Sequence, residues 1–188
     1  MKIGVLALQG DFREHRLALE KLGSTVLEVR LPEHLEQVEG LIIPGGESTA
    51  MGNLINAFGL MQPLRDFGVS KAIWGTCAGA ILLSKEVGRE QPLLELMDTE
   101  IERNAFGRQL QSFEIDLDAP FLEPEHPPYH ATFIRAPIFK RVFGRAKTLL
   151  SLPDGRIVAA QQGKLLATSF HPELTEDLRF HCYFLEMI

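Results

Sequence analysis

The first 83 residues alternate short apolar segments, typical of buried strands, with segments that carry helix signals. Strands are predicted at 2–8, 25–29, 41–43 and 72–74, and helices at 11–22, 33–38, 48–58 and 78–83. Strands that alternate with helices form parallel βαβ units. The chain is therefore predicted to be an α/β protein with three layers and a doubly wound, mostly parallel sheet.

The second half of the chain has a different pattern, in which short strands follow one another directly. Strands are predicted at 113–117, 131–135, 148–152, 157–161 and 165–170, with turn signals at 153–155 and 162–163. They are expected to be antiparallel additions to the sheet. The proline-rich segment 120–129 is predicted to be a loop, and 174–188 a closing helix. With 188 residues and no internal repeat, we expect one domain over 1–188.

Charge and apolar run length exclude several classes of function. The chain has 19 Lys and Arg against 25 Asp and Glu, a net charge of −6, so it lacks the basic surface of a nucleic-acid-binding protein. Apolar runs such as 78–83 are far shorter than the roughly 18 residues of a membrane span. The run 3–8 is too short for a signal peptide and has no cleavage site, so a cytoplasmic location is expected.

The two cysteines, Cys77 and Cys182, are not expected to form a disulfide in a reducing compartment. No CxxC pair is present, and four-ligand zinc sites need paired ligand spacings. We therefore expect no metal site.

Cys77 lies between a predicted strand and a predicted helix, with Gly75 and Gly79 two residues to either side. This is the pattern of a nucleophile elbow, in which a sharp turn presents the nucleophile and small residues let strand and helix pass closely. The N–H of Ala78 is placed to stabilise an oxyanion. The alternative is a small buried core cysteine.

A thiolate nucleophile needs a base, and His171 at the end of the strand 165–170 is the best candidate. Residues two apart in an extended chain project to the same side, so Glu173 can orient the imidazole. The other histidines do not end a strand with a carboxylate two residues later and are predicted to be surface or core residues: His15, His34, His126, His130 and His181.

A third feature is the strand 41–43 followed by Pro44-Gly45-Gly46-Glu47-Ser48. Glycines let a ligand approach the backbone, and the N–H groups at a helix start favour an anion, so this loop can supply a second oxyanion donor. A Gly-Gly pair alone is often just a turn. The GxxxxGK[ST] phosphate loop is absent.

Gly-Thr-Cys-Ala-Gly at 75–79, Pro-Gly-Gly-Glu-Ser at 44–48 and Phe-His-Pro-Glu at 170–173 together resemble the triad glutamine amidotransferases, which have the flavodoxin-like class I glutaminase fold. The segments 4–11, 103–109 and 133–137 are similar to those of the glutaminase subunits of pyridoxal 5'-phosphate synthase, the PdxT type. The resemblance spans nearly the whole chain, and 119–130 is its least typical part.

The resemblance implies that the chain hydrolyses L-glutamine to L-glutamate and ammonia, with Cys77 as nucleophile, His171 as acid and base, and Glu173 orienting His171. It implies no cofactor, because pyridoxal 5'-phosphate is the product of the complex. By position in the family motifs, Gly46 and Ala78 are the oxyanion donors, and Gln9 shapes the oxyanion region and the contact with the synthase. The residues implied to bind glutamine are Gly46, Glu47, Ser48, Arg103, Ile134 and Arg135.

The implied partner is a (β/α)8-barrel synthase that builds pyridoxal 5'-phosphate from ribose 5-phosphate and glyceraldehyde 3-phosphate. Family members assemble as twelve glutaminases around a twelve-subunit synthase core and pass ammonia internally. Three alternatives stay open: the glutaminase subunit of another amidotransferase, a cysteine peptidase or chaperone of the related α/β class, and a non-catalytic regulatory subunit. An intact Cys77, His171 and Glu173 set argues against the last of these.

Overall fold

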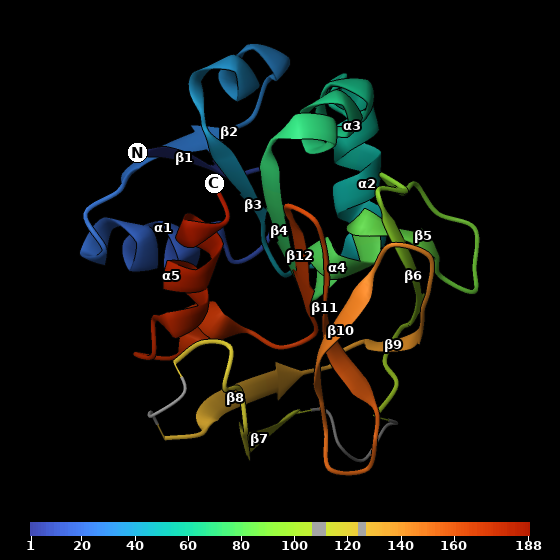
Figure 1. Cartoon of the computed structure of the whole chain (residues 1–188). Helices are drawn as coiled ribbons and strands as arrows, with labels where there is room; N and C mark the ends of the chain where they lie inside the picture. The colour runs from blue at the N-terminus through green and yellow to red at the C-terminus, as the bar shows by residue number, and fades with distance from the viewer. Residues whose placement is uncertain (107–111, 124–126) are drawn as a thin grey trace.

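The computed structural model of the chain describes residues 1–106, 112–123 and 127–188. Within them, a ten-stranded sheet has the order β2-β1-β3-β4-β12-β11-β9-β6-β5, and β10 pairs with β11 (Figure 1). Its strands are β1 (Lys2–Leu6), β2 (Thr25–Val29), β3 (Gly40–Ile43), β4 (Ala72–Thr76), β5 (Ser84–Glu86), β6 (Met97–Glu102), β9 (Ile138–Val142), β10 (Lys147–Ser151), β11 (Ile157–Gln162) and β12 (Leu165–Thr168).

The block β2-β1-β3-β4-β12 is parallel, whereas β11 runs antiparallel to β12, β9 and β10. This confirms the predicted α/β fold with antiparallel additions. Two expectations were wrong. The predicted strand 165–170 is β12, which joins the parallel block beside β4. The predicted strands 113–117 and 131–135 form a separate two-stranded sheet, β7 (Ser112–Leu117) and β8 (Tyr129–Ile134).

Helices cover both faces of the large sheet (Figure 1). On one face lie α1 (Phe12–Lys21) and α5 (Arg179–Glu186), and on the other α2 (Ser48–Ala57), α3 (Met61–Ser70) and α4 (Ala78–Leu83). Alternate strand residues enter the two cores: Ile73 packs with α2 and α3, while Trp74 packs with Phe180 and Phe184 of α5. Since successive side chains of a strand point to opposite faces of the sheet, one apolar strand contributes side chains to both cores.

Several helix boundaries differ from those expected. Asp11 makes no capping hydrogen bond to α1, and Leu17 is 53% exposed. The cap of α2 is Glu47, not Ser48 or Thr49. The predicted closing helix starts later than expected, because 3-10 turn η2 (Pro172–Leu174) precedes α5.

Four elements had no strong local signal and were not predicted: α3, β5, β6 and β9. The predicted helix at 33–38 is a 3-10 helix, η1 (Pro32–Gln37). Of the predicted loop 120–129, residues 124–126 lie outside the described residues, and Tyr129 begins β8.

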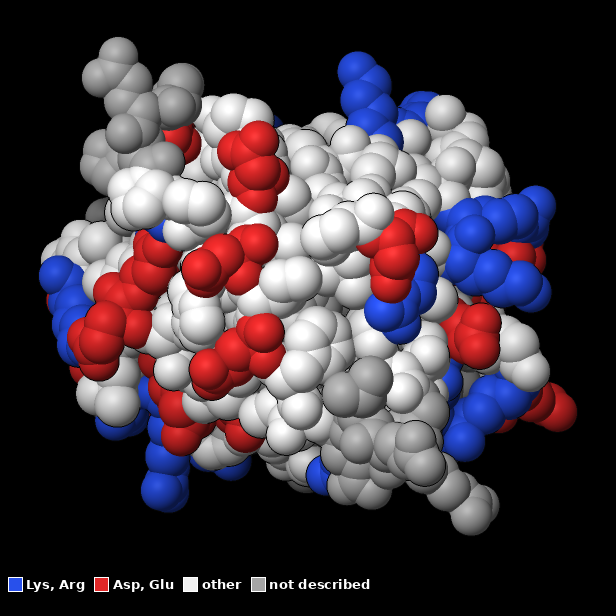
Figure 2. All heavy atoms as spheres, turned by 90° about the horizontal axis from the view of Figure 1, so that it is seen from below, with Lys and Arg blue, Asp and Glu red and all other residues white. Residues whose placement is uncertain are grey.

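The face seen from below carries many Asp and Glu side chains over one half, whereas Lys and Arg lie along its edges, with the largest group at the right (Figure 2). This face therefore has no continuous basic surface among its described residues of the kind that binds nucleic acid. In the described part of the chain, no helix has the length and apolar character needed to span a membrane.

Candidate active site

The loops that follow β1, β3, β4 and β12 meet at one edge of the sheet, because all four strands are parallel and end there. In open α/β sheets, ligands bind outside the carboxyl ends of the strands where the strand order reverses, here between β1 and β3. These loops, with residues after β6 and β8, enclose a pocket of about 760 Å³. Its walls include ten of the predicted residues: Gln9, Gly46, Glu47, Ser48, Cys77, Ala78, Arg103, Ile134, Arg135 and His171.

Cys77 occupies the tight turn between β4 and α4, with a φ of +48° that few residues other than glycine adopt. Its N–H donates to the carbonyl oxygen of Thr168 at 2.8 Å, which ties the turn to the end of β12. A Cβ on Gly79 would lie 2.0 Å from the carbonyl oxygen of Ile43. The glycine is therefore required for α4 to pass β3, as the elbow pattern predicts.

His171 follows β12, and its Nδ1 lies 2.6 Å from Oε1 of Glu173. Both side chains are buried, and Glu173 lies behind the pocket wall. The predicted pairing is confirmed, but its predicted extended backbone is wrong: Pro172 begins the 3-10 turn η2, and this turn brings the carboxylate back to the ring.

Opposing effects act on the charge of His171. Burial by itself lowers the pKa of His171, but hydrogen bonds to Cys77 and Glu173 and the negative charge of both raise it to about 10. Burial raises the pKa of Glu173, and the bond to His171 opposes that rise. An imidazolium beside the sulfur stabilises negative charge there.

Asp11 brings a second carboxylate to His171, with Oδ2 at 3.7 Å from Nδ1 of the ring. In the part of the chain that the structure describes, Asp11, His171 and Glu173 form the one group with metal-ligand atoms all within 4.8 Å of one another. The Nδ1 that this group offers is already hydrogen bonded to Glu173 at 2.6 Å. A metal ion at Nδ1 would have to replace this hydrogen bond.

Gln9 links the loop after β1 to the loop after β3. Its Oε1 accepts the N–H of Glu47 at 3.0 Å. Gly46 between them has a φ of +153°, and a Cβ there would lie 2.5 Å from the same Oε1. The side chain of Gln9 therefore packs against the backbone of the predicted oxyanion loop.

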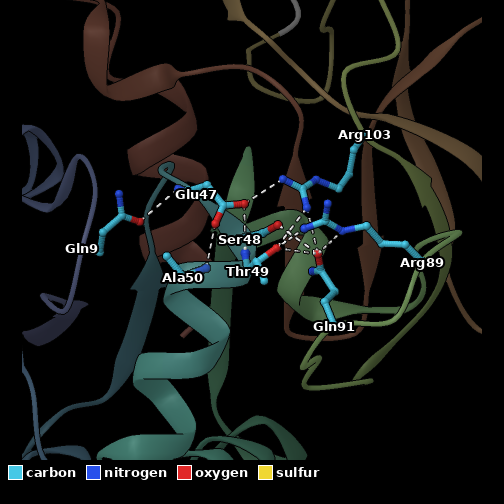
Figure 3. A network of polar contacts seen from close by, with 8 residues as sticks. All are labelled: Gln9, Glu47, Ser48, Thr49, Ala50, Arg89, Gln91 and Arg103. Atoms are coloured by element: carbon cyan, nitrogen blue, oxygen red, sulfur yellow. Dashed lines mark hydrogen bonds and ion pairs between the residues drawn. The ribbon is translucent and has the colours of Figure 1, made fainter.

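Glu47 and Arg103 form the centre of a polar network at the pocket (Figure 3). Oε1 of Glu47 lies 2.8 Å from Nη2 of Arg103, and its carboxylate accepts the N–H groups of Thr49 and Ala50. Partial burial alone raises the pKa of Glu47, but the bonds from Ala50, Thr49 and Arg103 lower it to about 2. The network thus keeps the carboxylate of Glu47 ionised and places it beside the guanidinium of Arg103 at the pocket.

Three side chains of this network were not predicted as site residues, namely Thr49, Arg89 and Gln91. Oε1 of Gln91 accepts from Arg103 at 3.0 Å, from Ser48 Oγ at 3.3 Å and from Arg89 at 3.3 Å. Arg89 also donates to Thr49 Oγ1. Arg89 and Gln91 lie in the irregular segment between β5 and β6, where no sequence motif marks them. Ser48 is predicted to bind substrate, and its hydroxyl points to Gln91 in this structure.

The pocket wall also includes Ile134, which ends β8, and Arg135, which follows it with a φ of +44°. Asn104, also on the wall, has a φ of +49°. Backbone strain of this kind concentrates at functional sites. Of the sequence motif 103–109, residues 103, 104 and 106 line the pocket, and residues 107–109 lie outside the described residues.

The remaining cysteine and the other histidines that the structure describes do not line the pocket. Cys182 is in α5 and partly buried. His34 is in η1, His130 is exposed on β8, and His126 lies outside the described residues. His15 and His181 are buried in the core, one of the two settings predicted for them. His15 contacts Glu173, which no sequence signal indicated.

Comparisons with known proteins point to one family. The sequence model of the SNO glutamine amidotransferase family matches residues 5–188. The chain is 58% identical over 190 residues to pyridoxal 5'-phosphate synthase subunit PdxT of Herpetosiphon aurantiacus, covering 98% of this chain and 99% of the relative. It is 54% identical over 191 residues to subunit PdxT of a Roseiflexus species, covering 100% of both. A crystal structure described as a glutamine amidotransferase superposes with a TM-score of 0.92 at 50% identity, covering 98% of this chain and 97% of that one.

Proposed function

Because the chain belongs to the SNO glutamine amidotransferase family, we propose that it hydrolyses L-glutamine to L-glutamate and ammonia for a synthase that makes pyridoxal 5'-phosphate. The observation that carries the chemistry is the convergence of Cys77, His171 and Glu173 at the pocket. A thiol, a base and an orienting carboxylate are the parts of a nucleophilic triad.

In the first half of the reaction, the Cys77 sulfur attacks the side-chain amide carbon of glutamine and forms a tetrahedral oxyanion. The N–H groups of Ala78 and Gly46 stabilise this charge; Ala78 is the first residue of α4, so its N–H has no acceptor within the helix. The C–N bond then breaks, and His171 gives its proton to the nitrogen, which leaves as ammonia. The product is a thioester on Cys77.

In the second half, His171 takes a proton from water, and the resulting hydroxide attacks the thioester. The C–S bond breaks, glutamate leaves, and the sulfur returns to its thiolate state with His171 protonated. Glu173 accepts the Nδ1–H throughout, which directs the other ring nitrogen to the sulfur and stabilises the imidazolium. Overall, glutamine and water give glutamate and ammonia.

Glutamine binding is assigned to Gly46, Glu47, Ser48, Arg103, Ile134 and Arg135, all on the pocket wall. Arg103 and Arg135 suit the α-carboxylate, since a guanidinium binds a carboxylate with two parallel hydrogen bonds. Glu47 suits the α-ammonium group. Bound substrate then replaces part of the contact between Glu47 and Arg103.

The partner is a (β/α)8-barrel synthase that takes ribose 5-phosphate and glyceraldehyde 3-phosphate. Ammonia passes to it internally, because ammonia in water at neutral pH is mostly ammonium, which is no nucleophile. We assign Gln9 to the part of the site that the synthase contacts. The assembly of twelve glutaminases with twelve synthase subunits, the cytoplasmic location and the single glutaminase domain over 1–188 are parts of the same proposal.

The test is the release of glutamate from glutamine by the purified chain, alone and with a barrel synthase subunit. Stimulation by the barrel that Cys77→Ala abolishes is the expected result. Equal activity with and without the barrel would keep the glutaminase and favour the subunit of another amidotransferase. No glutamate in either case would favour a non-catalytic regulatory subunit.

We propose no metal or cofactor, because thiol, imidazole and carboxylate together supply every proton and bond of the reaction. Dialysis against a chelator should leave the rate of glutamate release within about twofold of the untreated chain. A mock dialysis without chelator is the control. A large loss of rate that an added divalent cation restores would contradict this prediction.

A further inference from the structure

Two buried histidines lie behind the triad, and the mechanism above uses neither. His15 belongs to α1 and His181 to α5, two helices on the same face of the sheet (Figure 1). Nδ1 of His15 lies 3.0 Å from Nε2 of His181, and both residues are fully buried. The indole of Trp74 meets both rings edge-on, which fixes where the rings lie.

Nε2 of His15 points toward the reaction site. It lies 3.1 Å from Oγ1 of Thr76, the residue before Cys77, and 3.3 Å from Oε2 of Glu173. This oxygen is buried and has no well-aligned hydrogen bond with any described residue. His15 is thus the polar neighbour of the carboxylate oxygen that His171 does not use.

The surroundings of the two rings determine which nitrogens carry protons. A lone pair on Nε2 of His15 would face a carboxylate at 3.3 Å and be repelled, so Nε2 carries the proton and Nδ1 is the acceptor. His181 must then donate its Nε2–H to His15. This leaves Nδ1 of His181 as a bare acceptor, in agreement with its lack of any partner among the described residues.

Both histidines are neutral near pH 7. Burial lowers the pKa of His181 to about 4. Burial also lowers the pKa of His15, and positive charge on His181 or His171 would lower it further. His15 therefore presents a neutral N–H dipole to Glu173 and adds no second positive charge. Among the described residues, His171 is then the only imidazolium next to this carboxylate.

We propose that His15 is a positioning residue of the glutaminase reaction. Its Nε2–H, held in place by His181, faces Glu173 and Thr76 and so fixes both the carboxylate that orients His171 and the strand end that carries Cys77. The inference rests on the proposed function, and it names a residue that acts through Glu173 rather than on the substrate.

The test compares His15→Gln with His15→Asn in the full chain, assayed with the barrel synthase present. The amide nitrogen of glutamine reaches the place of Nε2, whereas that of asparagine reaches only the place of Nδ1. We expect His15→Asn to lower kcat about ten- to a hundredfold, the range found when partners behind a metal-bound histidine are removed, with KM within twofold. His15→Gln should keep most of kcat. His34→Asn, in η1 away from the pocket, is the control.

The pH profile gives a second readout. The titratable groups that face Glu173 are His171, Asp11 and His15. Loss of the His15 N–H leaves the Glu173 anion less stabilised and raises the pKa of Glu173. The acid limb of kcat/KM should therefore move to higher pH in His15→Asn and stay near its wild-type position in His15→Gln.

Two results would overturn the inference. One is a wild-type kcat in His15→Asn. The other is an equal loss of kcat in both variants together with the same drop in melting temperature, because His15 would then contribute only to packing. If the wild-type chain released no glutamate in the presence of its partner, this result would contradict the proposed function itself. The inference would then be decided by an NMR titration of His171. A lower titration midpoint in His15→Asn than in His15→Gln supports it, and equal midpoints overturn it.

Discussion

Cys77 and Cys182 have the same side chain in two different surroundings. Cys77 lines the pocket beside His171, whereas Cys182 lies in α5 without an imidazole partner among the described residues. Burial raises the pKa of the Cys182 thiol, and nearby carboxylates raise it further. The thiolate is the reactive form of cysteine, so these surroundings separate the two residues in reactivity.

An electrophile built on a glutamine skeleton should therefore modify Cys77 and spare Cys182. The measurement is a peptide mass map after partial reaction, with excess glutamine as a protecting control. Modification of Cys182 alone would contradict the assignment of the nucleophile.

At the scale of single elements, the elbow between β4 and α4 depends on two backbones that pass at close range. A methyl group at Gly79 would meet the carbonyl oxygen of Ile43 at 2.0 Å, and backbone there cannot move without moving β3. Gly79→Ala should therefore lower the free energy of unfolding by about 3 kcal/mol, the upper part of the range for overpacking, and abolish activity.

The matched control is Gly163→Ala, in an open turn where an added Cβ meets no atom within 4 Å. Its φ of +57° alone costs about 1–2 kcal/mol in a residue other than glycine. Urea unfolding of both variants checks the comparison. Equal losses would mean that the close approach of α4 to β3 is not what requires glycine at position 79.

Helix α2 begins at a carboxylate that also faces the pocket. Glu47→Ala removes the cap of α2 and the partner of Arg103, and loss of a cap costs about 1 kcal/mol. The pKa of Glu47 in the folded chain, about 2, lies below its ordinary 4.5. Its contribution to stability is therefore present above pH 4.5 and lost as the pH falls toward 2.

Urea unfolding at several pH values from 7 to 2 measures this effect. The difference in stability between the wild type and Glu47→Ala should shrink as the pH falls. Glu176→Ala, which removes an exposed partner of Lys21, is the control and should change stability by less than about 0.5 kcal/mol. A difference that is as large at pH 2 as at pH 7 would contradict the assigned pKa.

At the scale of the whole molecule, one sheet joins the two ends of the sequence. β12, from the last quarter of the chain, lies between β4 and β11 and completes the parallel block that β1 begins. The buried indole of Trp74 packs against α5 on one side of this sheet. Unfolding of either half therefore disrupts the core of the other.

The full chain should unfold in one cooperative transition. Fluorescence of Trp74, the only tryptophan in the sequence, and far-UV circular dichroism should give coincident urea curves. Two separated transitions would show that the chain contains two independent units and would contradict the single domain proposed for 1–188.

The sequence by itself determined the elements with local signals. The alternation of strands and helices, the glycine-flanked Cys77 and the His171-x-Glu173 spacing are patterns within a few residues. The structure contains the alternation, the turn at Cys77 and the contact between His171 and Glu173, although a 3-10 turn rather than extended backbone brings Glu173 to the ring. The predicted residues that follow β1, β3, β4 and β12 come together because the ends of parallel strands share one edge of the sheet. That rule needs only the order of elements, which local patterns supply. Arg103, Ile134 and Arg135 lie at the ends of β6 and β8, outside this parallel block.

Only the tertiary structure decided which distant side chains meet. His15 lies 61 residues from Thr76 and 166 from His181 in the chain, and Gln91 lies 12 from Arg103. The same holds for β7 and β8, which pair with each other rather than with the main sheet. Such contacts depend on how helices and strands pack in three dimensions, and no residue pattern of a few positions encodes that packing.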